Sequence, residues 1–323
     1  MRSAHARTLW VIGPHAHPQG VRQANRLLAA LHEAGAAGSV WLTGGRADFD
    51  AAGFEVLQGS GWLALGRAAR RFARIHALDS SAHRSARWAG LLSGRPLLRS
   101  WVGDEPPPRP PVLWGGGRVV LPHAVAGWPT HTPLVGEVVP HHAPNVNRVR
   151  DWLDAQALRA ATYVGWVGAS AAGLQQAVAV LDTLRHQGTD AALLALGWGP
   201  SPAPLPPLAR WIDRSQDCEA ADFFWAFNGL VATESSWAAR LGVAEAFQQR
   251  VPVVAPAGLL SDVLHVGRAQ PNTDLAQALH RAWEDASATA VQVEAGFAWA
   301  QARHRPDVVA RQLLALYGQG AGR

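Results

Sequence analysis

Short apolar runs alternate with amphipathic stretches along the first part of the chain. Residues 9–12 and 40–43 are apolar runs of strand length, and residues 21–34 between them carry leucines on one helical side. A glycine-bearing loop links the first run to the helical stretch. Strand, loop, helix and strand in this order form a βαβ unit, which predicts an α/β fold with a parallel sheet.

Further short strands are predicted at residues 96–102, 119–121 and 137–140. The proline-rich residues 104–111 are interpreted as a surface loop, because strand-like runs resume after them. We therefore expect one N-terminal α/β domain over residues 1–143.

Residues 144–323 repeat the same pattern. A strand is predicted at residues 162–164, a loop from residue 165, a helix at 174–185 and a strand at 191–196. Two successive Rossmann-like halves predict ligands at the carboxyl ends of the strands. A last helix is expected over residues 297–317.

Residues 233–264 have the most informative local pattern. Ser235 and Ser236 are suited to cap a helix, residues 251–255 form a short β run, and residues 256–258 end it. A capped helix N-terminus can bind an anion such as phosphate, with Arg240 one turn into the helix; an ordinary capped helix is the alternative.

The composition narrows the class of protein. A length of 323 residues fits two domains, and 48% hydrophobic with 16% charged residues indicates a globular chain. The single cysteine, Cys218, excludes an intramolecular disulfide and a cysteine-rich metal site. No apolar run approaches 18 residues, and the first run is too short for a signal peptide, so we expect a cytoplasmic protein.

All the fixed cations are arginines. The formal net charge is +5 and the sequence contains no lysine. An anionic ligand must therefore be held by arginine, histidine or backbone N–H groups. A lysine-dependent P-loop and a Schiff-base mechanism are excluded.

The segment around Glu245-Ala246 and Pro252-Val253-Val254, with Asp262 after it, resembles the donor-binding segment of the group-1 (family-4) nucleotide-sugar glycosyltransferases. Shorter matches elsewhere follow the family order; they lie at residues 74–79, 95–98, 138–140 and 197–200 and at Gly165 and Gly173. The resemblance covers nearly the whole chain.

This resemblance implies a GT-B arrangement of two Rossmann-like domains with parallel sheets facing across a cleft. The acceptor domain would be residues 1–143 and the donor domain residues 144–323, with the helix at 297–317 packing back on the first domain. The implied activity is hexosyl transfer from a nucleotide-sugar to an unknown glycan, lipid or small-molecule acceptor, with retention of configuration and no metal or cofactor.

The resemblance also implies a set of site residues. Glu245 would accept hydrogen bonds from the ribose, and His76 would lie near the reacting sugar, although a buried structural histidine is the alternative. His17 and Gly20 would face the acceptor. The donor would contact Gly165, Trp166, Gly197, Ser235, Ser236, Trp237, Arg240 and Glu245.

Departures from the family pattern fall where catalysis would occur. Trp166 stands at the arginine position, Ala171 or Ala172 at the lysine position, and Trp237 at the first glutamate. Either tryptophan could stack on a ligand ring or be buried in the core. Loss of these charges favours a second hypothesis, a non-catalytic binding or scaffolding relative.

Two other patterns have alternative interpretations. Arg67, Arg70, Arg71 and Arg74 are spaced as one helical face, which would contact an anionic membrane or be an ordinary solvated surface. Nucleic acid is not expected, because no aromatic-basic motif accompanies them. His15 and His17 lack a third ligand for a metal.

Overall fold

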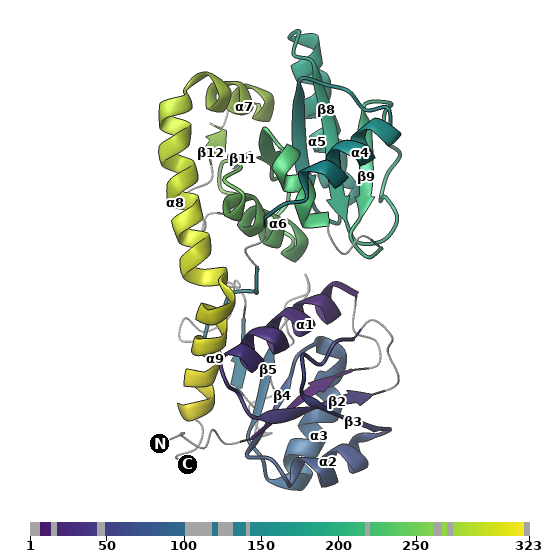
Figure 1. Cartoon of the computed structure of the whole chain (residues 1–323), viewed down its shortest axis with the longest axis vertical. Coiled ribbons are helices and arrows are strands. Elements are labelled where there is room, and N and C mark those ends of the chain that lie inside the picture. The colour runs from purple at the N-terminus through teal and green to yellow at the C-terminus, as the bar shows by residue number, and fades with distance from the viewer. Residues whose placement is uncertain are drawn as a thin grey trace. The chain divides into compact units, whose positions relative to one another are not determined.

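The computed structural model describes residues 7–13, 18–43, 49–100, 118–121, 132–139, 143–216, 220–260, 267–269 and 274–319. Contacts divide the chain into two compact units: residues 1–140 with 303–323, and residues 141–302. Each unit contains a parallel sheet with helices on both faces (Figure 1). The predicted α/β class with two Rossmann-like units is confirmed.

The first sheet has the order β3-β2-β1-β4-β5-β6. Its strands are β1 (Thr8–Ile12), β2 (Gly38–Thr43), β3 (Glu55–Gly59), β4 (Arg74–Ala77), β5 (Leu97–Ser100) and β6 (Arg118–Val120). The helices of this unit are α1 (Pro18–Glu33), α2 (Trp62–Ala69), the 3₁₀ turn η1 (Ser80–Ala82), α3 (His83–Ser93) and α9 (Pro306–Gln319).

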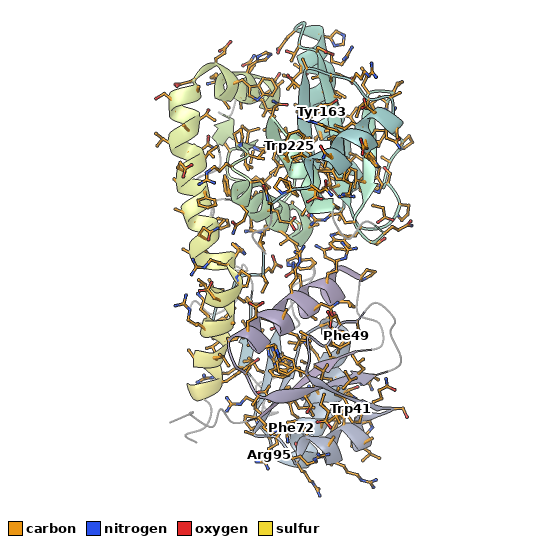
Figure 2. All side chains as sticks on the ribbon, viewed as in Figure 1. Trp41, Phe49, Phe72, Arg95, Tyr163 and Trp225 are labelled. Carbon is orange, nitrogen blue, oxygen red and sulfur yellow. The ribbon has the colours of Figure 1, made fainter. Side chains whose placement is uncertain are left out.

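Strand β1 is buried along its whole length, because helices cover both faces of the sheet. Leu9 and Val11 pack on the side of α2 and α3, with Trp41 and Phe72 (Figure 2). Trp10 and Ile12 alternate with these residues along β1 and pack on the opposite face of the sheet, with α1 and α9. Figure 1 shows α1 on one face of this sheet and α2 and α3 together on the other.

The second sheet has the order β12-β11-β10-β7-β8-β9. Its strands are β7 (Thr162–Val167), β8 (Ala191–Gly197), β9 (Ala209–Asp213), β10 (Gly229–Val231), β11 (Val253–Pro256) and β12 (Gly267–Ala269). The helices are α4 (Val146–Ala155), α5 (Ala171–His186), the 3₁₀ helix η2 (Ala220–Ala226), α6 (Trp237–Gln248), α7 (Leu275–Glu284) and α8 (Ala286–His304). Apolar clusters on both faces of the sheet explain why every residue of β8 is buried.

Two strand predictions were wrong in detail. Residues 137–139 form no strand; the segment before them makes one isolated bridge, between Leu121 and Leu134. Residues 165–167 belong to β7 rather than to a loop. Gly165 belongs to the strand because it pairs with Leu194 of β8 and Leu230 of β10, and the Phe227 ring occupies the space where a side chain would be.

The predicted helix over residues 297–317 is two helices. Helix α8 ends at His304 and α9 begins at Pro306, since proline has no N–H to continue the helix and its ring clashes with the preceding turn. Residues 303–323, which include α9, group with the first unit, and residues up to 302 group with the second.

The four arginines predicted to share one helical face do not do so. Helix α2 ends at Ala69, so Arg70 is its C-cap and Arg71 lies in the following turn. Arg74 is buried in β4. The helix is short because the chain must turn into this buried strand. No described helix is both long and apolar enough to cross a membrane.

Candidate functional site

The candidate donor site lies at the carboxyl ends of β7 and β10 in the second unit. The chain leaves β7 and enters α5 at Ser170, and it leaves β10 and enters α6 at Ser236. Both serines are N-caps: the Ser170 Oγ accepts from Gly173 N at 3.0 Å, and the Ser236 Oγ accepts from Ala239 N at 3.1 Å. The β7 and β10 strands are neighbours in the parallel sheet, so the two helix N-termini approach the same edge. The predicted Ser236 cap is confirmed.

Glu234 joins the two helix N-termini. Its carboxylate accepts from Ala169 N at 2.8 Å and from Ser170 N at 3.1 Å. The hydroxyls of Ser170 and Ser236 also donate to it. A negative group therefore occupies the N-terminal end of α5, where the helix dipole favours an anion.

Sequence reasoning did not single out Glu234. Its only signal was an acidic residue directly before a pair of capping serines. That pattern does not show that the carboxylate contacts the loop after β7, some 65 residues earlier in the chain.

Two glycines allow this close approach. A side chain at Gly168 would lie 2.7 Å from a carboxylate oxygen of Glu234, and one at Gly173 would collide with the same carboxylate. Thr233 also packs there, and its hydroxyl donates to the Gly173 carbonyl at 2.8 Å. The space above α5 is thus already filled by Thr233 and Glu234.

Trp166 and Trp237, two predicted donor contacts, are both buried. Trp166 is fully buried in β7, and its indole N–H donates to Thr233 Oγ1 at 2.7 Å. Trp237 is 4% exposed in the first turn of α6. Of the two interpretations of these tryptophans, the structure shows the buried one, and neither ring offers a face for stacking on a ligand.

Glu245 is also buried, and it is paired. Its carboxylate accepts from Arg214 Nη2 at 2.7 Å, and the two side chains are 4% and 2% exposed. The Arg214 guanidinium lies 5.3 Å from the centre of the Trp198 ring, beyond the end of β8. The ion pair fixes the orientation of the carboxylate, so α6 presents it to the turn after β9 rather than to solvent.

The other predicted donor contacts are spread between core and surface. Gly165 is buried within β7, and Gly197 ends β8 with the Trp211 ring against its Cα. Ser235 is exposed before α6, and Arg240 Nε donates to its carbonyl at 3.3 Å. Ser235, Ser236 and Arg240 are therefore brought together at the α6 N-terminus, and the two glycines shape the strands below it.

His76, the predicted catalytic residue, is fully buried in β4 of the first unit. Its Nδ1 lies 2.6 Å from the Tyr317 hydroxyl and its Nε2 lies 2.7 Å from Ser100 Oγ. Trp10 Nε1 donates to the same Tyr317 oxygen at 3.1 Å. Burial, with a smaller effect from His83, lowers the pKa of His76 to about 3. The ring is therefore neutral at neutral pH and links β4 to α9; its catalytic role stays a prediction.

Of the two predicted acceptor contacts, His17 and Gly20, the structure describes only Gly20. His15 and His17 lie outside the described residues. Gly20 is buried in the first turn of α1, which begins at Pro18, so the predicted loop at this glycine was wrong. The described residues hold no group of three or more histidine, cysteine, aspartate or glutamate side chains that could bind a metal ion.

Comparisons with known proteins link this geometry to one kind of fold. No protein-family model matches the sequence, and no curated protein matches it. A glycosyltransferase from Rickettsia africae has a TM-score of 0.76 at 12% identity, covering 99% of this chain and 100% of that one.

Two further structures agree. HepE of Anabaena, solved with UDP and glucose, has a TM-score of 0.75 at 13% identity, covering 97% of this chain and 100% of its own. Sucrose-phosphate synthase from Thermosynechococcus elongatus has a TM-score of 0.59 at 15% identity, covering 97% and 98%. The chain has the GT-B-like fold of these glycosyltransferases.

Proposed function

We propose that the protein is a glycosyltransferase that moves a hexosyl group from a nucleotide-sugar to an acceptor. The observation that carries the proposal is the pair of helix N-termini at the carboxyl ends of β7 and β10. Their capping serines, Ser170 and Ser236, both donate to the Glu234 carboxylate, which brings the two N-termini to one anion position. HepE, which shares the fold, was also solved with UDP-glucose. The sequence resemblance implies retention of configuration and independence of metal, and both are part of this proposal.

The donor diphosphate would bind to backbone N–H groups, because the chain has no lysine to hold it. The N–H groups of Ala169 and Ser170 already bind a carboxylate, so they are aligned for an anion. Arg240 and Ser235 would approach the phosphates from α6. The Glu245 side chain is 4% exposed, so it could accept hydrogen bonds from the ribose only if the residues around its ion pair with Arg214 moved apart.

A second candidate is a non-catalytic binding or scaffolding subunit with the same fold. Glu234 favours it, because a fixed carboxylate occupies the anion position and would repel a diphosphate. The tryptophan at the family's arginine position favours it too, since Trp166 is buried and provides no cation. A leaving diphosphate would then lack the electrostatic stabilisation that transfer requires.

Calorimetry against UDP, GDP, UDP-glucose and GDP-mannose tests the proposal. We expect micromolar binding of at least one nucleotide. The variant Ser235→Phe should abolish it, because a ring at this exposed position covers the α6 N-terminus without disturbing the core. The matched control is Gln187→Phe, at the exposed C-terminal end of α5.

Incubation of each bound nucleotide-sugar with acceptor mixtures then separates the two candidates. Release of nucleotide together with a glycosylated product supports the transferase. Binding without any turnover favours the non-catalytic subunit. If none of the four nucleotides binds, the proposed donor site is wrong, both for the transferase and for a non-catalytic subunit that binds nucleotide.

A further inference from the structure

Exposed apolar side chains gather on the outer side of α2 and α3. Of the nine large hydrophobic residues that are exposed among the described residues, five belong to these two helices. They are Trp62, Leu63, Trp88, Leu91 and Leu92, with exposed fractions between 41% and 53%. The Trp62 and Trp88 rings lie 6.0 Å apart, so the helices contribute to one patch, which we call the α2–α3 surface.

The packing of the helices explains how the patch forms. Leu65, Ala69, Ala86 and Ala89 bury the inner faces of α2 and α3 against the sheet. Gly66 lets the helices approach closely, since a side chain there would lie 3.1 Å from Leu92 Cδ1. An ordinary surface helix carries polar residues on its outer side. Here tryptophans and leucines take those positions although the inner face already supplies the core.

The segment that forms this patch carries mostly positive charge. Between residues 61 and 100 the sequence has eight arginines and one carboxylate, Asp79. Asp79 is buried and accepts from the backbone N–H groups of Gly13 and Ser81, so its charge is used inside the fold. Arg67, Arg70, Arg71, Arg84 and Arg95 are exposed.

These arginines have no acidic partner among the residues that the structure describes. No ion pair to a carboxylate is formed by any of the five within the described part of the chain. Arg95, labelled in Figure 2, donates instead to the Arg70 carbonyl at 2.9 Å. Within the described part of the chain, the surface therefore combines arginines that form no ion pair with exposed indole and leucine side chains.

We propose that the α2–α3 surface docks the protein on an anionic lipid bilayer. Leu63, Leu91 and Leu92 would enter the boundary between headgroups and acyl chains, and the amphipathic indoles of Trp62 and Trp88 would lie at that depth. The arginines would contact lipid phosphates. This proposal replaces the single arginine face expected from the sequence and is independent of the proposed transfer reaction.

Other occupants fit the surface less well. A second copy in a twofold interface would place arginine opposite arginine, because the same patch meets itself. A nucleic acid would attract the arginines but has no acyl phase to receive the leucines. Anionic lipid satisfies both the charge and the apolar area.

Vesicle flotation of the full chain tests the proposal. We expect binding to phosphatidylcholine vesicles that contain phosphatidylglycerol, at least tenfold weaker binding to phosphatidylcholine alone, and loss of binding at high salt. Leu63→Ser with Leu91→Ser should weaken binding by about tenfold or more, since both substitutions remove apolar area that the bilayer would bury. Arg67→Glu with Arg71→Glu should remove it.

Matched controls lie on other helices. Val291→Ser changes an apolar side chain of α8 that is 70% exposed, and Arg281→Glu changes an exposed arginine of α7. Both should bind as the parent does. All substituted side chains are exposed, and unchanged thermal unfolding verifies that the variants fold.

Three results would overturn the proposal. These are no flotation with anionic vesicles, unchanged flotation of the double leucine variant, and a parent dimer in light scattering that the leucine variant converts to a monomer without any vesicle binding. The last result would assign the surface to self-association.

Discussion

At the scale of single residues, the acidic side chains of the second unit differ most from what their sequence positions indicate. The sequence resemblance places Glu245 at the position of a ribose contact, yet its side chain is buried against Arg214. Glu234 is in no motif, yet it accepts from two backbone N–H groups at the α5 N-terminus. A motif specifies a position in the chain, but the partners of a carboxylate depend on which segments the fold brings within about 3 Å.

Glu234→Gln tests the carboxylate that occupies this site. If the α5 N-terminus receives the donor phosphates, removal of the negative charge should tighten UDP binding by about tenfold, since about 1.4 kcal/mol of relieved repulsion corresponds to that factor. The glutamine carbonyl can still accept from Ala169 or Ser170. Calorimetry measures the change.

Glu284→Gln, at the exposed end of α7, is the control and should leave UDP binding unchanged. Weaker binding by Glu234→Gln would contradict a repulsive role and assign Glu234 to direct contact with the ligand.

At the scale of elements, most strands and helices follow from the apolar pattern, because each must bury one side. The misplaced elements are those whose ends depend on neighbours. Gly165 continues β7 because it pairs with β8 and β10 on either side, and the helix predicted over residues 297–317 is interrupted before Pro306. Tyr317 then fixes α9 to β4 and β1 through His76 and Trp10, a contact across more than 240 residues.

The buried His76 should make this attachment of α9 sensitive to acid. The pKa of His76 is about 3 in the folded protein against 6.5 for a free histidine. The unfolded chain therefore binds a proton that the folded chain does not between these values. The contribution of His76 to stability is complete above pH 6.5 and falls by up to about 1.4 kcal/mol per pH unit as the pH drops toward 3.

Urea unfolding at a series of pH values measures this slope. His76→Gln should reduce it between pH 6 and pH 4, because the amide keeps a donor and an acceptor for Ser100 and Tyr317 without titrating. The remaining slope includes His83, whose pKa burial lowers to about 4. His186→Gln, an exposed residue at the end of α5, is the control and should retain the parental slope. An equal slope in the parent and His76→Gln would refute the assignment.

At the scale of the whole molecule, the two units carry different candidate surfaces. The anion position lies in residues 141–302, and the α2–α3 surface lies in residues 1–140. The sheets of the two units have the same spatial order of strands, so their different surfaces come from the residues at strand ends and on helices rather than from topology.

Hydrogen exchange should separate the two surfaces. UDP should slow exchange at the start of α5 and α6, and anionic vesicles should slow exchange in α2 and α3. Each ligand should leave the other surface unchanged, because an amide is protected where the ligand covers or stabilises its hydrogen bond. Protection of α2 and α3 by UDP would contradict the separate assignment.

The sequence by itself determined the class of fold, the two Rossmann-like units and the cap at Ser236, because apolar periodicity and capping are local properties. It also determined that any anion must be bound without lysine. Tertiary structure alone decided that Glu234 fills the α5 N-terminus, that Arg214 pairs with Glu245, that His76 is buried against Tyr317, and that two helices present tryptophan and leucine outward. Each of these depends on contacts between segments distant in the sequence, and no local pattern records which side chains such contacts bury.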